Sequence, residues 1–277
     1  MQIAMIEDQI VPTEELSPTY LDRGLYFGDG VYEALRSYNG KILAFDEHLQ
    51  RFSSSLAAVK VTGVDIEQIR RRVQKAFDAA AIPNALIYFH ITRGSTIRNH
   101  IWEPGLKPNF FLTITKLPDS PQRKTKGIAV STYPDLRWKK CNIKSLNLLP
   151  NVLAINDATA KGSEEAILVN EAGLITEGSL SAFFAISDQK LQTAPLTSNI
   201  LPSITRGFVI QAAKDVGLEL IEKSLTPQKA ADADELFVAG TTFDIVPVVK
   251  FDDKTIGNGT PGEYTKLLIN RFISFTV

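Results

Sequence analysis

The chain has 277 residues, of which 44% are hydrophobic and 22% are charged. These fractions are typical of globular proteins and exclude a disordered, fibrous or coiled-coil protein, while the length favours one large domain or two modest ones. Thirty basic and 31 acidic residues leave a net charge of −1, so we expect neither nucleic acid nor a membrane among the partners.

The supply of cysteine and histidine limits metal and redox chemistry. One cysteine cannot form an internal disulfide, which favours a reducing, cytoplasmic compartment, and three histidines beside it make a soft-ligand metal site improbable. Glu7 and Asp8 stand where a signal peptide would be apolar, and no apolar run approaches the ~20 residues of a membrane helix. We therefore expect a cytoplasmic protein without a bound metal.

Strands and helices alternate in the first half. Asn39-Gly40 is a strong hairpin signal because both residues tolerate positive φ, and Asp46 is expected to cap the first helix. Strands are expected at 30–36, 85–92 and 109–115, with helices at 46–59 and 65–80. Residues 116–126 contain two prolines and four basic residues and have no apolar periodicity, which is typical of a linker.

The second half alternates more finely. Strands are expected at 127–132, 166–170, 174–176, 182–186, 235–239 and 244–249, with helices at 147–160, 205–216 and 261–272. This order predicts an α+β protein with largely antiparallel sheets. We predict a small N-terminal α/β domain at 1–118, a linker at 119–126 and a larger C-terminal domain at 127–277, with a site between the domains.

Lys144 is the first candidate for chemistry. Ile143 and Leu146 lie on either side of it, and desolvation by such neighbours lowers the pKa of a lysine and frees its amine for Schiff-base formation. A lysine whose amine simply reaches solvent is the commoner case, and the residues around Lys144 do not by themselves decide between the two.

Three polar segments are further candidates. Ser203 or Thr205 can cap a helix whose free amides bind phosphate, although an ordinary capped helix would look the same. Glu177 lies among small polar residues and is either a functional carboxylate or part of a polar turn. Arg98 and His100 are two residues apart, so in extended chain they point the same way and could hold a carboxylate; the alternative is a solvent-exposed loop.

Five segments together carry a resemblance to a known family. They are Tyr20 to Glu33, Asp46 to Phe52, Asn142 to Asn147, Thr176 to Ser179, and Ile200 to Arg206. In this order they resemble the class IV (fold type IV) pyridoxal-phosphate aminotransferases, over about residues 22–248. The resemblance implies a two-domain fold type IV enzyme with pyridoxal 5′-phosphate between the domains.

The resemblance also implies roles for individual residues at the cofactor. Lys144 matches the lysine that holds the cofactor and moves the proton between substrate and cofactor. Glu177 matches the carboxylate facing the pyridine nitrogen, and Arg51 the arginine at the cofactor phosphate. The backbone amides of Ile204 and Thr205 and the hydroxyl of Thr241 match the rest of the phosphate site.

Substrate selection is implied by a second set of residues. Arg98 and His100 resemble the carboxylate trap of D-amino acid aminotransferases, which enters the site from the partner subunit and works with a tyrosine matching Tyr32. Thr242 is expected to contact substrate as well. The resemblance therefore implies a homodimer with shared sites that transaminates D-amino acids such as D-alanine or D-glutamate with 2-oxoglutarate or pyruvate, by a ping-pong mechanism.

Some residues depart from the pattern of that group. Leu180 and Ala182 replace polar residues near the cofactor, and Ser203 stands where glycine is usual in the phosphate turn. Trp138 is expected to pack on the cofactor side, with plain core as the alternative. The remaining alternatives on the same fold are a branched-chain L-aminotransferase, an (R)-amine transaminase, an aminodeoxychorismate lyase-like enzyme and a cofactor-binding protein without catalysis.

Overall fold

The first sheet is antiparallel throughout, with strand order β4-β3-β5-β6. Its strands are β3 (Gly30–Tyr38), β4 (Lys41–Ile42), β5 (Ala85–Thr92) and β6 (Asn109–Lys116). The turn between β3 and β4 has Asn39 at φ 49° and Gly40 at φ 85°, so the hairpin predicted there is confirmed. The computed structural model describes residues 2–277.

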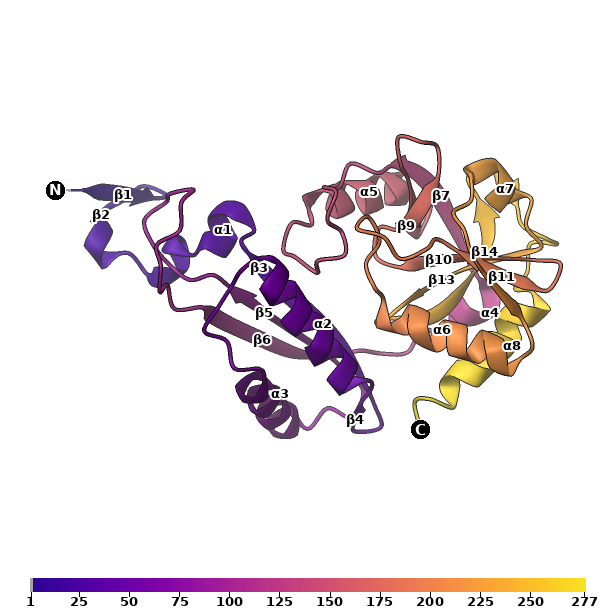
Figure 1. The fold of residues 1–277 in the computed structure, drawn as a ribbon, viewed down its shortest axis with the longest axis horizontal. Coiled ribbons are helices and arrows are strands. Elements are labelled where there is room, and N and C mark those ends of the chain that lie inside the picture. Colours follow the sequence, from indigo (N-terminus) through magenta and orange to yellow (C-terminus); the bar gives the residue numbers. More distant parts are fainter. Residues whose placement is uncertain (1) are drawn as a thin grey trace.

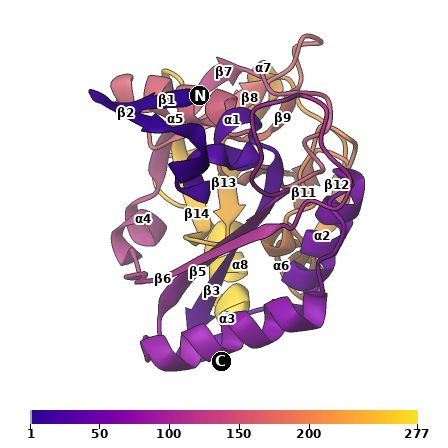
Figure 2. The same ribbon diagram turned by 90° about the vertical axis from the view of Figure 1, so that its left-hand side faces the viewer.

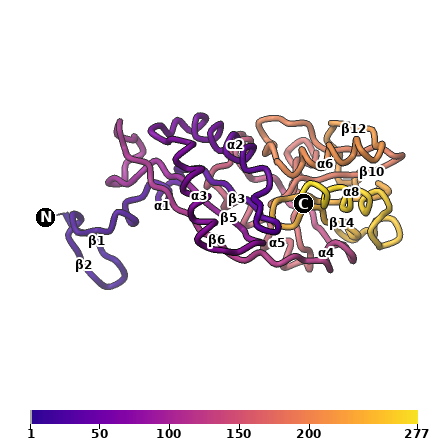
Figure 3. The backbone as a smooth tube through the Cα atoms, turned by 90° about the horizontal axis from the view of Figure 1, so that it is seen from below, coloured from indigo at the N-terminus to yellow at the C-terminus, as the bar shows by residue number. Residues whose placement is uncertain are grey.

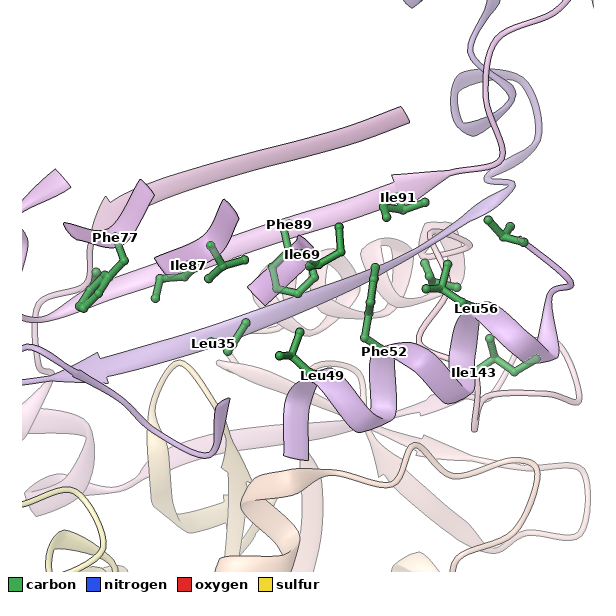
Figure 4. Close-up of a cluster of buried hydrophobic side chains, with 14 residues drawn as sticks. Leu35, Leu49, Phe52, Leu56, Ile69, Phe77, Ile87, Phe89, Ile91 and Ile143 are labelled. Carbon is green, nitrogen blue, oxygen red and sulfur yellow. The ribbon is translucent and has the colours of Figure 1, made fainter. Parts of the chain in front are cut away.

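Two helices, α2 (Phe45–Ala58) and α3 (Ile66–Ala80), cover one face of this sheet, α2 against β3 and α3 against β6 (Figures 1 and 2). Alternate residues of β3 and β5 point into the layer between sheet and helices, where Leu35, Phe52 and Phe89 are completely buried (Figure 4). The opposite face of β3 carries Tyr32 and Ala34 and turns toward the second half of the chain.

The predicted cap of α2 is wrong. The helix begins one residue before Asp46, and its N-cap is Ala44, in the left-handed region at φ 52° and without a side-chain cap. Asp46 lies in the first turn and pairs instead with Arg70 of α3, with 2.6 Å between Oδ1 and Nη1. A carboxylate in this turn still interacts favourably with the helix dipole, which explains why the residue pattern resembled a cap.

The second sheet has nine strands and is mixed. Its order is β12-β11-β10-β13-β14-β7-β8-β9, with β15 paired to β14. The strands are β7 (Ile128–Pro134), β8 (Glu165–Val169), β9 (Ile175–Gly178), β10 (Ala182–Ser187), β11 (Lys190–Thr193), β12 (Glu219–Glu222), β13 (Glu235–Gly240), β14 (Asp244–Phe251) and β15 (Lys254–Thr255). Three pairs, β14/β7, β7/β8 and β11/β12, are parallel, so the expected antiparallel character holds only for the other five.

Helices pack on this sheet from several directions (Figure 1). They are α4 (Pro121–Lys126), α5 (Leu149–Ala160), α6 (Ile204–Asp215), α7 (Pro227–Ala231) and α8 (Glu263–Ile273). Helix α5 lies against β7 and β8, while α6 and α8 pack on each other and on β13. Helix α4 packs on β14, so the segment predicted as a linker is partly helical and held to the second sheet.

The N-terminal segment was not predicted to have structure. Strands β1 (Ile3–Ile6) and β2 (Gln9–Pro12) form a hairpin that projects from the first half (Figure 3). Short 3-10 turns at 13–15 and 18–21 lead into the five-residue helix α1 (Arg23–Phe27). Within residues 2–277, none of the helices has the length and apolar character needed to cross a bilayer.

The two halves meet through ionic contacts around Asp244 at the start of β14. Its Oδ1 accepts from Arg36 Nη1 of β3 at 3.0 Å and also from the Tyr38 hydroxyl, and its Oδ2 accepts from Lys124 at 2.7 Å. Burial and the Asp244 charge raise the pKa of Tyr38 well above its usual range, so the phenol stays a donor. Arg36 Nη1 also donates to the carbonyl of Thr242, at 3.4 Å.

Asp244→Asn should therefore destabilise the junction between the halves. Asparagine tolerates the φ of +64° found at this position, so the change removes charge with little backbone strain. Leaving Arg36 buried beside a neutral amide is expected to lower the free energy of unfolding by about 3 kcal/mol. Urea unfolding at pH 7 measures this. Asp188→Asn is the matched control, since Asp188 is exposed at φ 50°; an equal loss in both variants would refute the explanation.

Candidate active site

A cavity of about 340 Å³ lies between the two halves. The first half lines it with Tyr32, Ala34 and Arg51. The second half lines it with residues that include Arg137, Lys144, Glu177, Leu180, Thr241 and Thr242. Six of the residues singled out in the sequence therefore share one cavity: Tyr32, Arg51, Lys144, Glu177, Thr241 and Thr242.

Lys144 is placed by backbone pairing between the halves. The segment after β7 runs beside the start of β3, where Tyr32 N donates to Lys144 O and Leu146 N donates to Gly30 O, both at 3.0 Å. The Lys144 amine lies 4.3 Å from the centre of the Tyr32 ring and donates to its hydroxyl at 3.3 Å. The amine is thus held in the cavity and half-buried, instead of extending into solvent.

Arg51 is held by a buried carboxylate. Its Nε and Nη2 donate to the two oxygens of Glu33 at 2.8 and 2.7 Å, and Nη1 donates to the carbonyl of Pro202 at 3.0 Å. His48 Nδ1 lies 2.7 Å from Glu33 Oε2. Burial raises the pKa of Glu33, but Arg51 and His48 outweigh it and bring the value to about 2. Burial lowers the pKa of His48, despite the opposing effect of Glu33.

Glu33→Gln should lower stability in a pH-dependent way. The folded-state pKa of Glu33 lies below its ordinary value of 4.5, at about 2, so the carboxylate stabilises the fold above pH 4.5 and this contribution is lost as pH falls toward 2. The shift corresponds to about 3 kcal/mol at pH 7. Urea unfolding of wild type and variant at pH 7 and pH 3 measures the difference, which should narrow at pH 3. Glu47→Gln, at an exposed position of α2, is the control; a difference independent of pH would contradict this account.

Glu177 lies near the end of β9 and faces the cavity from a buried position. Arg137 Nη1 donates to its Oε1, and the backbone amide of Leu201 donates to the same oxygen at 3.2 Å. Burial raises the pKa of Glu177, while Arg137 and this amide oppose the rise. Arg137 is itself held by Asp135, whose oxygens accept from Nε and Nη2 at 2.8 Å each. The arrangement keeps a carboxylate in a site with little water.

The start of α6 lies beside the cavity. Ser203 is its N-cap and accepts from the Arg206 amide at 3.2 Å, so one of the two predicted caps is confirmed. The next two amides, of Ile204 and Thr205, find no hydrogen-bond acceptor among the described residues. Ile204 and Thr205 line a small recess that also contacts Thr241. Free amides at a helix N-terminus suit a phosphate.

Arg98 and His100 do not line the cavity of their own chain. Both side chains are exposed and lie against Phe27 of α1, the Arg98 guanidinium 5.1 Å and the His100 ring 5.1 Å from the centre of that ring. The two predicted trap residues thus lie together, as their spacing implies, but apart from Lys144 within one chain.

The departures from the family pattern lie at the cavity wall. Glu165, buried at the start of β8, accepts from Ser179 Oγ at 2.5 Å and Ser181 Oγ at 2.8 Å, which holds the turn between β9 and β10. Leu180, between these serines, is 62% exposed and lines the cavity, as does Trp138, at 42%. Trp138 is therefore a wall residue and not core.

Comparison with known proteins identifies the family. A family model described as Amino-transferase class IV matches residues 30–251. The chain belongs to the class IV aminotransferases. D-alanine aminotransferase of Bacillus licheniformis is 34% identical over 266 residues, which cover 95% of this chain and 93% of that protein. The enzyme of the same name from Staphylococcus haemolyticus is 35% identical over 275 residues, with 98% and 97% covered.

Solved structures agree on the fold of this aminotransferase. A branched-chain amino acid aminotransferase from T.th., complexed with N-(5′-phosphopyridoxyl)-L-glutamate, has a TM-score of 0.84 and 26% identity, and the alignment covers 97% of this chain and 92% of that one. The fold class expected from the sequence is therefore confirmed, and the chain is a pyridoxal-phosphate-dependent transaminase.

The residues present fit such a cofactor. Unpaired amides of Ile204 and Thr205 together with Arg51 suit its phosphate, and Glu177 suits its pyridine nitrogen. The Lys144 amine, whose hydrogen-bond partner among residues 2–277 is the Tyr32 hydroxyl, suits its aldehyde. The chemistry of these groups therefore matches pyridoxal phosphate.

Sequence reasoning missed three polar residues of the aminotransferase site. Arg137 lies in a polar loop two residues after Asp135, where it resembles an ordinary surface arginine. Glu33 and His48 are within the quoted motifs but received no role. Their signal was position: Glu33 is on the buried face of a strand and His48 on the buried face of a helix, where a charged group requires a partner.

Proposed function

We propose that the cavity binds pyridoxal 5′-phosphate through Lys144 and that the enzyme transaminates D-amino acids. The bound cofactor supplies an electron sink for the substrate α-carbon. Arg51, the amides of Ile204 and Thr205, and the Thr241 hydroxyl bind its phosphate. Glu177 keeps the pyridine nitrogen protonated, and Arg137 in turn keeps Glu177 ionised.

Lys144 has two roles in this proposal. Its amine forms the covalent link to the cofactor and, once substrate has displaced it, takes the proton from the α-carbon and returns it at the cofactor. The Tyr32 hydroxyl, 3.3 Å away, holds the free amine at the cavity wall next to the substrate. Thr242, one residue after the phosphate-binding Thr241, contacts the substrate side chain.

The carboxylate of the substrate is bound by Arg98 and His100 of a second copy of the chain. Both side chains are exposed in one chain and outside its own cavity, so a homodimer with shared sites accounts for them. Which side binds the carboxylate decides which enantiomer presents its α-hydrogen to Lys144. The single observation that carries D-specificity is this Arg-x-His pair, in a chain 34% identical to a D-alanine aminotransferase over nearly its whole length.

The reaction has two halves. A D-amino acid such as D-alanine or D-glutamate gives up its amino group and leaves as a 2-oxo acid, and 2-oxoglutarate or pyruvate then accepts that group. The first product leaves before the second substrate binds, which predicts ping-pong kinetics.

A second candidate is a branched-chain L-aminotransferase, favoured by the TM-score of 0.84 to such an enzyme. The two candidates require opposite enantiomers, so one assay separates them. Purified enzyme is given 2-oxoglutarate with D-alanine, L-alanine, D-leucine or L-leucine, and the 2-oxo acid formed is measured.

Turnover of D-alanine at least ~100-fold faster than L-alanine is expected, which corresponds to about 3 kcal/mol of discrimination. Faster turnover of L-leucine than of D-alanine would replace the proposal with the second candidate. Omitting 2-oxoglutarate should stop the reaction after one turnover; continued release of pyruvate without an acceptor would indicate a lyase.

A further inference from the structure

The loop that carries Arg98 and His100 has no regular secondary structure from residue 96 to 108. A trap for a carboxylate must nevertheless be placed accurately, because an error of about 1 Å in substrate position can cost about 100-fold in rate. The trap side chains are exposed, so their placement in one chain depends on what holds the backbone of residues 98–100.

Arg23 of α1 is the residue that holds this backbone. The residue is 3% exposed, and its guanidinium donates through Nη1 to the carbonyl of Asn99 and through Nη2 to that of His100, at 3.2 Å for the latter. The third donor, Nε, binds Asp29 Oδ2 at 2.8 Å. One guanidinium thus fixes two successive peptide groups of the trap segment.

The base on which Arg23 stands is itself well anchored. Asp29 also accepts from Arg93 Nε at 2.8 Å and from Nη2 at 2.9 Å, and Arg93 donates further to the carbonyls of Val59 and Lys60. Backbone bonds from Arg23 N to Gly94 O and from Arg93 N to Asp29 O, both 3.0 Å, join α1 to the start of the loop. Because Arg93 still pairs with Asp29 without Arg23, the carboxylate keeps a partner if Arg23 is replaced.

Phe27 completes the arrangement. The Arg23 guanidinium lies 4.8 Å from its ring centre, and the Arg98 and His100 side chains lie against the same ring, each 5.1 Å from its centre. Cation–π and stacking contacts of this kind restrict the directions in which exposed side chains point. The ring therefore supports both trap side chains at once.

We infer that Arg23 is a positioning residue for recognition of the substrate carboxylate, acting through the Asn99 and His100 carbonyls, with Phe27 as the support for the trap side chains. This rests on the proposed function, in which Arg98 and His100 bind that carboxylate. Arg23 itself touches neither substrate nor cofactor. Its removal should impair binding of carboxylates by the dimer and leave the chemistry at Lys144 largely intact.

The test compares Arg23→Gln, Arg23→Lys, Phe27→Leu and Arg98→Ala with wild type, as holoenzymes. Arg71→Gln is the matched control, because Arg71 is a mostly exposed arginine of the same half, paired with Asp65 at 3.6 Å. For each protein we measure KM and kcat for D-alanine and for 2-oxoglutarate and the absorbance of the bound cofactor.

Arg23→Gln is expected to raise both KM values at least ~10-fold, with kcat within ~3-fold of wild type and the bound-cofactor absorbance retained. Lysine keeps the charge beside Asp29 but cannot reach both carbonyls in the same fixed geometry, so Arg23→Lys should raise KM less. A KM like that of the Arg71→Gln control, or loss of kcat and cofactor absorbance together with KM, would overturn the inference.

Two variants keep this result interpretable. If Arg23→Gln does not fold, Phe27→Leu decides: the same rise in KM at retained kcat supports the inference, and an unchanged KM overturns it. Arg98→Ala separates the inference from the proposed function. An unchanged KM in Arg98→Ala would refute the trap itself, whereas a raised KM there with a normal KM in Arg23→Gln would refute only the role of Arg23.

Discussion

Replacing Lys144 with alanine should reduce transamination by about 10⁴-fold or more, because one amine both links the cofactor and moves the α-proton. The amine is the group on the cavity wall that can perform both steps, and the Tyr32 hydroxyl that it contacts lacks the basicity to replace it. Turnover of D-alanine with 2-oxoglutarate measures the rate. Borohydride reduction followed by mass spectrometry should add the mass of the cofactor to the wild-type chain and not to the variant.

Lys140→Ala is the matched control for this prediction. Lys140 lies four residues earlier in the same loop and is exposed, and its carbonyl, which the substitution retains, accepts from the Ile143 amide at 3.2 Å. The control should keep wild-type turnover and the covalent link. Turnover in Lys144→Ala within ~10-fold of wild type, or a reduced cofactor adduct at another lysine with activity retained, would show that the lysine has been assigned wrongly.

Local patterns predicted those parts of the fold whose partners are close in sequence. The Asn39-Gly40 turn, the Asp65 cap of α3 and the alternation along β3 and β5 are set by neighbouring residues, and the structure has all of them. The parallel pairing of β7 with β14 could not be read in this way. It joins segments more than 110 residues apart, and a strand fully buried on both faces shows no period that reveals its neighbours.

The same distinction applies to the site. Lys144, Glu177 and Arg51 were found because each lies in a short segment typical of the family, and the fold brings them to one cavity. Arg137 and Asp244 were not found, because their importance comes from partners distant in the chain: Glu177 lies 40 residues from Arg137, and Arg36 lies 208 residues from Asp244. A charged residue that will be buried against such a partner looks in sequence like a charged surface residue.

Glu177→Gln should lower kcat/KM by about 10²–10³-fold, the cost of removing one preorganised charge from a water-poor site. Glutamine keeps the shape of the side chain and can still meet the Leu201 amide, but it cannot keep the pyridine nitrogen protonated. The fold should be little affected, because Arg137 remains paired with both oxygens of Asp135. Steady-state kinetics with D-alanine, together with urea unfolding, measure the two effects separately.

Two further variants decide whether charge or shape is responsible. Glu177→Asp retains the negative charge but shortens the side chain, and Glu164→Gln removes a charge at a surface position, where Glu164 is about half-exposed and paired with Arg123. If charge is what the site requires, the aspartate variant should keep more activity than Glu177→Gln, and Glu164→Gln should match wild type. If the aspartate variant were the less active of the two, packing of the Glu177 side chain would matter more than its charge, and the proposed role at the pyridine nitrogen would fail.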